Sequence, residues 1–232
     1  MDDQKKFFFL VIRPNHFILN AINENCELLH KEEYFFNEED YKDNIDTLKK
    51  FLDENIFKIE KKFNLYIQDI YLIIDDNNFI NIDITLIKDF KNLFTKIDNN
   101  FIDLSNIKNS VLKSNIDFQL VHMIINRFII NKKDYLIIPD QIDKKNLFLE
   151  IRFICLRTKA FLNLEKIFLK YQISIKKVLS YEYVNSFKTD KTDYISIVAN
   201  KLINGLNKNE VNFRKKYPKN IGFFERFFNF FS

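Results

Sequence analysis

Glycine is nearly missing from this chain of 232 residues, which has only Gly205 and Gly222. Loops that hold phosphate groups need glycine, because their backbone adopts positive φ angles and approaches the ligand closely. Neither the GxGxxG pattern of dinucleotide-binding folds nor the GxxxxGK(S/T) pattern of P-loops occurs in the sequence. We therefore expect the protein to bind no nucleotide and to carry no cofactor.

Cysteine and histidine, the residues of many metal sites, are rare as well. Cys26 and Cys155 lack the CxxC spacing of metal and redox motifs, and we expect them to be buried free thiols. His16, His30 and His122 are isolated in the sequence, with no thiol or carboxylate at a metal-binding interval, which favours ordinary strand or surface positions. No GxSxG elbow presents a nucleophile. The sequence thus predicts neither a metal site nor a catalytic residue, and we expect a protein that is not an enzyme.

Long apolar runs are also missing. No stretch of 18 or more apolar residues is present, whereas a helix that spans a bilayer needs roughly 20. The apolar run from Phe7 to Ile12 is too short for a signal peptide and is followed by no small-residue cleavage site. The hydrophobic content of 47% suffices for one domain or two small ones. These features predict a cytoplasmic protein.

The periodicity of the first part predicts a small α+β unit. Alternating and continuous apolar runs predict strands, and apolar residues spaced by three and four predict a helix that packs on them. The predicted elements are an antiparallel meander of strands over Phe7–Arg13, His16–Asn23 and Glu27–Phe36, a helix from Tyr41 to Phe63, and a buried strand over Asp69–Asp75. Asp75 and Asp76 at the end of this strand are either ligands of a divalent cation or turn residues.

The second part continues with strands and short helices. Phe79–Ile87 alternates like a strand, although the spacing from Leu86 to Ile97 also suits a helix. The other predicted elements are a helix capped by Ser105 and ending at Lys113, strands over Gln119–Ile130 and Asn146–Leu156, a helix from Ala160 to Tyr171, a strand over Val178–Val184, a loop over Asn185–Asp193, and a helix over Tyr194–Leu206 with Asp193 as its cap and Gly205 at its end.

The tail has the most distinctive pattern. From Asn207 onward there are six basic and two acidic residues, and the rest of the chain is balanced, so the whole net charge of +4 lies in the tail. The last stretch, IGFFERFFNFFS from Ile221 to Ser232, places its phenylalanines on one face of a helix. At about 1.5 Å per residue this helix is too short to cross a bilayer, but it suits the interface of an anionic membrane.

The residues predicted to bind the membrane are Ile221, Phe223, Phe224, Arg226, Phe227, Phe228, Phe230 and Phe231, with Lys215, Lys216 and Lys219 of the preceding linker. The alternative is that these rings pack on the core of the protein itself. Nucleic acid is not the expected partner, because the aromatic residues share one face and do not alternate with basic residues as stacking platforms do.

Four stretches follow one another in an order that resembles a known family. They are LYIQDIYLIIDDNNFI (Leu65–Ile80), QLVHMIINRFIINKK (Gln119–Lys133), the stretch Asn146–Val184, and DYISIVANKLINGL (Asp193–Leu206) ahead of the basic tail. This order resembles the bacterial cell-division protein FtsA, a member of the actin-like ATPase group. His122 matches the histidine of the family's VLHVIPQEYxID strand, and the tail resembles its membrane-targeting helix.

The chain departs from this family at its nucleotide site. Arg13, Pro14, Asn15 and His16 stand where the family has an Asp-x-Gly-Thr phosphate turn. The resemblance also implies that the second lobe, with its glycine-rich loops, is missing after Val184, so the ATP site is lost. In the family that lobe holds the C-terminal peptide of the ring protein FtsZ, which puts FtsZ docking in doubt here.

The resemblance implies an α+β fold, namely a truncated actin-like first subdomain with an inserted α/β subdomain and a C-terminal amphipathic helix. Its parts are the first subdomain (1–77), the inserted subdomain (78–157), closing elements (158–206), a basic linker (207–220) and the membrane-targeting helix (221–232).

The resemblance to FtsA implies that the protein is a non-enzymatic cell-division scaffold on the cytoplasmic face of the inner membrane at midcell. Such a scaffold binds later division proteins and further copies of itself, chiefly through the inserted subdomain. The alternative is an actin-like cytoplasmic adaptor of a pilus or secretion assembly. A third hypothesis, a soluble enzyme for a small molecule, has no site in the sequence.

Overall fold

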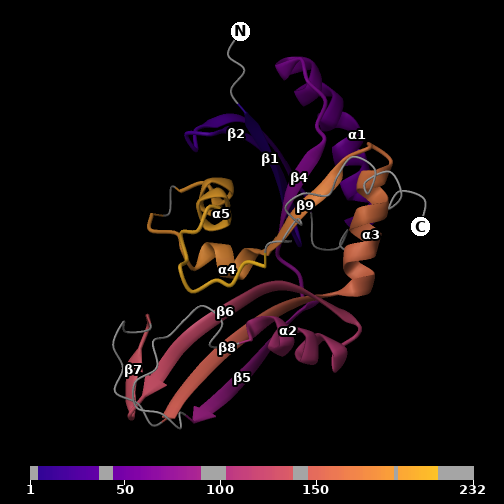
Figure 1. The fold of residues 1–232 in the computed structure, drawn as a ribbon. Coiled ribbons are helices and arrows are strands. Elements are labelled where there is room, and N and C mark those ends of the chain that lie inside the picture. The colour runs from indigo at the N-terminus through magenta and orange to yellow at the C-terminus, as the bar shows by residue number, and fades with distance from the viewer. Residues whose placement is uncertain (1–4, 37–43, 90–102, 138–145, 191–192, 214–232) are drawn as a thin grey trace, which may run out of the picture.

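The computed structural model describes residues 5–36, 44–89, 103–137, 146–190 and 193–213, which form two β-sheets with helices packed on them (Figure 1). The basic linker from residue 214 and all the residues predicted to bind the membrane lie outside the described residues. Among the described residues, no helix has both the length and the apolar character that a bilayer span requires.

The first sheet has five strands in the order β3-β2-β1-β4-β9. Strands β1, β2 and β3 pair antiparallel, which confirms the predicted meander, whereas β4 runs parallel to β1 and β9 runs parallel to β4. The local pattern predicted these strands but not their parallel pairing. The strands are β1 (Lys6–Arg13), β2 (His16–Asn23), β3 (Leu28–Phe35), β4 (Asp69–Ile74) and β9 (Ser174–Ser180).

Helices cover both faces of the first sheet (Figure 1). Leu10 of β1 belongs to a core shared with helices α1 (Asn44–Phe63) and α3 (Thr158–Leu169). Its neighbour Val11 belongs to a second core shared with helices α4 (Tyr181–Asn185) and α5 (Ile195–Ile203). Because a strand buried on both faces needs apolar residues at every position, β1 reads as a continuous apolar run.

The second sheet has the order β5-β8-β6-β7, and all its pairs are antiparallel. One face is covered by helix α2, whose Ile107 and Val111 pack against a core that includes Ile151 and Phe153 of β8. On the other face, Arg152 forms a two-pronged ion pair with Asp83 of β5. The elements are β5 (Phe79–Asp89), α2 (Leu104–Lys113), β6 (Phe118–Ile130), β7 (Lys133–Tyr135) and β8 (Asn146–Arg157).

The chain enters and leaves the second sheet at neighbouring residues. The backbone N–H of Arg157, at the end of β8, donates to the carbonyl oxygen of Asn78, just before β5, over 3.1 Å. The next residue, Thr158, starts α3 and returns the chain to the first sheet. We call this paired entrance and exit the neck.

Several predicted boundaries are wrong for local reasons. The strand predicted over Val178–Val184 ends at Ser180, whose hydroxyl caps α4, so Tyr181 to Val184 are helical. The short strand β7 was not predicted. Phe79–Ile87, which the pattern left between strand and helix, lies in strand β5, and the part of the helical alternative from residue 90 onward lies outside the described residues.

Two predicted helix caps are also wrong. Asp103, not Ser105, caps α2, since its Oδ1 accepts from the backbone N–H of Asn106 over 2.9 Å. Asp193 does not cap α5; its Oδ2 accepts from Thr189 and Asp190 in the preceding loop. Gly205, with φ of 94°, does end α5 as expected.

Candidate functional site

The three parallel strands of the first sheet end at one edge. Ile12 of β1 pairs with Ile74 of β4, and Ile74 pairs with Ser180 of β9. We call this line, with the residues that follow it, the carboxyl edge. In open α/β sheets, ligands bind outside the carboxyl ends of the strands, so a ligand site in this fold is expected at this edge.

At the carboxyl edge, the turn after β1 is engaged by its own neighbours. The Nε of Arg13 donates to Oδ2 of Asp75 over 3.2 Å, and its guanidinium lies over the ring of Tyr181 at 4.6 Å. His16 stacks on Phe35 with ring centroids 3.7 Å apart, and burial lowers its pKa below 6.5 against the opposing influence of Glu33. His16 is therefore neutral at pH 7, and the turn offers a phosphate no unpaired cation.

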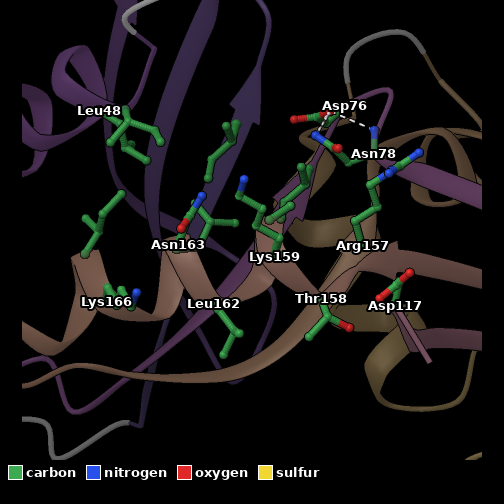
Figure 2. A pocket seen from close by; sticks show the side chains of 16 residues that line it. Leu48, Asp76, Asn78, Asp117, Arg157, Thr158, Lys159, Leu162, Asn163 and Lys166 are labelled. Atoms are coloured by element: carbon green, nitrogen blue, oxygen red, sulfur yellow. Dashed lines mark hydrogen bonds between the residues drawn. The ribbon is translucent and has the colours of Figure 1, made fainter.

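The two aspartates after β4 have separate roles. Asp75 pairs with Arg13, whereas Oδ1 of Asp76 accepts from the backbone N–H of Asn78 over 2.8 Å and from its side-chain amide over 2.7 Å (Figure 2). An aspartate that binds the backbone two residues later stabilises a turn. Of the two interpretations drawn from the sequence, the turn thus matches these contacts. In the part of the chain that the structure describes, no three His, Cys, Asp or Glu residues cluster as a metal site.

A groove lies beside the carboxyl edge, between α1 and α3, with a volume of about 900 Å³. Its floor comes from the ends of β1 and β4, and one end of it is formed by the neck. It is lined by Ile12, Ile45, Leu48, Ile74, Asp76, Asn78, Asp117, Arg157, Thr158, Lys159, Ala160, Leu162, Asn163, Leu164, Lys166 and Ile167. We refer to this set as the groove.

The groove combines an apolar floor with a charged rim. Ile45 of α1 and Leu162 of α3, which line it, remain 45% and 43% exposed. The side chains of Lys159 and Asn163 extend from α3 to the side on which Leu48 of α1 lies (Figure 2). An apolar centre within a polar rim is typical of surfaces that bind protein segments.

On the opposite face of the first sheet, the fold assembles a buried polar cluster that the sequence did not reveal. His122 of β6 lies beside Glu210, with Nδ1 and Oε1 2.9 Å apart, and its Nε2 accepts from the backbone N–H of Ser180 over 3.1 Å. Tyr183 of α4 donates to Oε2 of Glu210 over 3.0 Å, and Lys177 of β9 donates to Oε1 over 3.3 Å. We call His122, Lys177, Ser180, Tyr183 and Glu210 the Glu210 cluster.

The Glu210 cluster resembles a hydrolase triad in composition but not in geometry. The serine contacts His122 through its backbone N–H and not through a hydroxyl that the imidazole could deprotonate. The side chains of His122 and Glu210 are 0% and 3% exposed, which leaves no room for a substrate. His122 lies in a strand, as the sequence favoured, and its carboxylate partner is 88 residues further along the chain, beyond the short intervals that the sequence analysis considered.

The cysteines fit their prediction in part. Both are free, and Cys155 is fully buried in the core of the second sheet. Cys26 is only half-buried, because it lies in the turn between β2 and β3, where its Sγ accepts from Asn200 over 3.3 Å.

Comparison with known proteins finds structural neighbours alone. No protein-family model matches the chain, and no curated protein matches its sequence. The PilM-PilN type IV pilus biogenesis complex is similar to it with 9% identity and a TM-score of 0.47 over 79% of this chain and 50% of that one. The cytoplasmic domain of EpsL, an inner membrane component of the type II secretion system of Vibrio cholerae, has 6% identity and a TM-score of 0.37 over 81% and 59%.

A third solved structure, from Bacteroides thetaiotaomicron, is described as a protein with actin-like ATPase fold and unknown function. It has 11% identity and a TM-score of 0.34 over 81% of this chain and 58% of that one. This chain therefore spans between 50% and 59% of the length of these three chains.

Proposed function

We propose that this chain is a non-enzymatic adaptor with an actin-like fold, which holds a segment of a protein partner in the groove. The observation that supports this function is the groove itself, with Ile12 and Ile74 in its floor and Arg157, Lys159 and Lys166 at its rim. An amphipathic helix binds to such a surface by burying its apolar face while its polar residues meet the rim.

The path of the chain supports the actin-like fold. A three-stranded meander, a helix and a parallel strand are followed by a second sheet, after which α3 and β9 return to the first sheet. This is the order that the resemblance to FtsA implies. We accordingly propose 1–77 and 158–206 as the first subdomain and 78–157 as the inserted subdomain.

The adaptor would serve a larger assembly at the membrane, for which there are two candidates. A pilus or secretion machine, the alternative drawn from the sequence, fits the proteins named above at least as well as a cell-division scaffold does. We put the pilus or secretion adaptor first. A fluorescent fusion tests this order: foci that coincide with a pilus or secretion machine support it, and a midcell band in dividing cells supports the division scaffold.

We also propose that residues 221–232 bind an anionic membrane surface with the help of Lys215, Lys216 and Lys219. Each basic residue near an anionic leaflet adds about 1 kcal/mol of attraction, whereas the phenylalanines contribute on any lipid. Neutralising the three lysines should weaken binding to anionic vesicles and leave binding to neutral vesicles unchanged. A chain that ends at residue 213 should bind neither, and a truncated chain that still sediments with vesicles would contradict the proposal.

Site-specific crosslinking tests the groove as the partner site. A photoreactive amino acid at Asn163, which lines the groove, should crosslink to a cytoplasmic segment of a membrane protein in the cells that make this chain. The same group at Glu165, an exposed residue of α3 that does not line the groove, is the matched control. Equal crosslinking from both positions would contradict the proposal.

A pair of leucine substitutions gives an independent test. Leu162 and Leu169 are both exposed on α3, but only Leu162 is among the residues that line the groove. Leu162→Glu should abolish the crosslink from Asn163, while Leu169→Glu should leave it intact. Loss of the crosslink in both variants, or binding of a small metabolite by the groove in place of a protein segment, would overturn the adaptor function.

A further inference from the structure

The residues after α5 run beside β6 and form an isolated antiparallel bridge with it. We call residues 207–212 the C-terminal segment. Within it, Glu210 bridges antiparallel to Ile124, Asn209 O accepts from the N–H of Ile125 over 3.0 Å, and the N–H of Val211 donates to Met123 O over 2.8 Å. The segment thus extends the second sheet while it starts from a helix on the first sheet.

Glu210 is the main side-chain anchor of the C-terminal segment. Its Oε1 contacts His122 and Lys177, and its Oε2 accepts from the hydroxyl of Tyr183, which in turn accepts from Asn207 Nδ2 over 2.9 Å. These partners come from β6, β9 and α4, so a single carboxylate joins both sheets and a helix. Removing one partner of such a buried group costs far more than an exposed contact does.

The hydrogen bonds fix the protonation state of His122. Nε2 accepts from the backbone N–H of Ser180, so it carries no proton, and Nδ1 therefore carries the one that it donates to Glu210. A second proton at Nε2 would point at the N–H of Ser180 only 3.1 Å away. The docked arrangement thus requires a neutral imidazole beside a charged carboxylate.

We propose that the Glu210 cluster is an acid-sensitive latch, which holds the C-terminal segment on β6 when His122 is neutral and releases it when His122 binds a proton. Besides the Glu210 cluster, the segment is held by its two backbone hydrogen bonds to β6, by the packing of Val211 against the core of the second sheet, and by two polar side-chain contacts. Asn209 Nδ2 donates to the exposed Leu136 carbonyl, and Lys177 also reaches Asn212 over 3.3 Å. The latch stands whichever partner occupies the groove.

The direction of the pH dependence follows from the two ionisable residues. Burial lowers the pKa of His122 below 6.5 despite its hydrogen bond to Glu210, so below that pH the released state binds a proton that the docked state does not. Burial alone would raise the pKa of Glu210, but the contacts with His122, Lys177 and Tyr183 outweigh it and lower the pKa below 4.5. Docking therefore weakens as the pH falls below about 6.5, and weakens again below about 4.5.

Three charged or titratable groups face His122, and burial outweighs the one that favours its protonation. Glu210 of the segment favours the proton, Lys177 of β9 disfavours it, and Tyr183 of α4 stays neutral, since burial raises the pKa of its phenol. No proton reaches His122 without breaking the bond from Ser180, and this couples protonation to opening.

Hydrogen exchange on the full chain tests the latch. Protection of the Ile125 and Val211 amides, relative to the amides of β1, should fall roughly tenfold between about pH 7.5 and about pH 5.5, because a released histidine of ordinary pKa favours protonation by that factor. Tyr183→Phe should lower this relative protection at both pH values and keep the pH dependence. His122→Gln should remove the pH dependence.

The matched control is His30→Gln, since His30 lies on β3 and not in the Glu210 cluster. This variant should behave as the wild type. If protection at Ile125 and Val211 is flat with pH, or falls only in step with the amides of β1, the cluster is a static part of the core and the latch is wrong. The wild-type profile and Tyr183→Phe decide this even if His122→Gln does not fold.

Discussion

At the scale of single residues, burial decides which side chains are chemically available, as the two thiols illustrate. Cys155 is fully buried, and burial raises the pKa of its thiol to about 11. Cys26 is half-buried in a turn. A maleimide reagent at pH 7.5 should therefore label Cys26 in the folded protein and Cys155 only after denaturation, because the thiolate is the reactive form.

Mass spectrometry of peptides from the labelled protein gives the measurement. Cys26→Ser serves as the control, since it should leave the folded protein unlabelled. Rapid labelling of Cys155 in that variant would show that the second sheet opens readily and would contradict its closed core.

The Glu210 cluster shows what single-residue reasoning could not find. His122 was visible in the sequence, and so was Glu210, but their contact depends on β6 and the C-terminal segment meeting at the edge of the second sheet. Metal and catalytic motifs are recognised by short spacings, and this pair has none. Only the three-dimensional arrangement makes Glu210, near the start of the charged tail, a buried residue.

At the scale of secondary-structure elements, helix α2 provides a test of its cap. Asp103→Ala should lower the free energy of unfolding by about 1 kcal/mol, because it leaves the N–H of Asn106 without its acceptor. Ser105→Ala, at the position the sequence first suggested, should change it by much less. Urea denaturation of both variants gives the comparison, and a larger loss for Ser105→Ala would contradict the assignment.

The end of α5 provides a second test. Gly205 has φ of 94°, and the N–H groups of Gly205 and Leu206 donate back to Leu202 and Lys201, as in a Schellman motif. A Cβ at this position would meet nothing within 4 Å, so the cost of Gly205→Ala is backbone strain alone, about 1 kcal/mol. Gly205→Asn should cost less, because asparagine tolerates positive φ. Equal stability of wild type and Gly205→Ala in urea would contradict this.

Helices and strands could be predicted from the sequence where the spacing of apolar residues and the turn residues indicate the same boundary. β1 and β2 begin and end within a residue of their predicted bounds, because an apolar run meets the Pro14–Asn15 turn between them. The prediction failed at β9, whose apolar residues continue into α4; Ser180 ends the strand only because its hydroxyl caps that helix. An apolar run alone does not separate a strand from the buried helix that follows.

At the scale of the whole molecule, the sequence predicted the meander and the α+β composition but not how the strands join. The parallel pairs β1–β4 and β4–β9 connect segments far apart in the chain, and they create the carboxyl edge and the groove. No local pattern encodes such pairing. The expected loss of the phosphate turn came instead from comparing residues 13–16 with the turn that the resemblance to FtsA implies at that place.

We predict that Mg-ATP does not bind. The turn after β1 holds Arg13 in an ion pair with Asp75 and against Tyr181, so among the described residues this turn presents no unpaired cation to a phosphate. Calorimetric titration should show no heat of binding. An actin-like ATPase with intact glycine-rich phosphate loops is the positive control. A dissociation constant in the micromolar range for this chain would contradict the prediction.

The neck makes the second sheet an insertion whose two ends lie side by side, and we call the residues between Asn78 and Arg157 the cassette. The chain enters the second sheet at Asn78 and leaves it at Arg157, and one backbone hydrogen bond joins these two residues. The residues between them can therefore be exchanged, in evolution or by design, while the pairing of Ile12, Ile74 and Ser180 stays in place. The contacts of this part with the rest of the molecule limit the exchange, since Leu156 and Ile154 also belong to the two cores of the first sheet. A new cassette has to bring its own partner for Glu210, since His122 belongs to the part that is replaced. Related chains with different cassettes should therefore change positions 122 and 210 together.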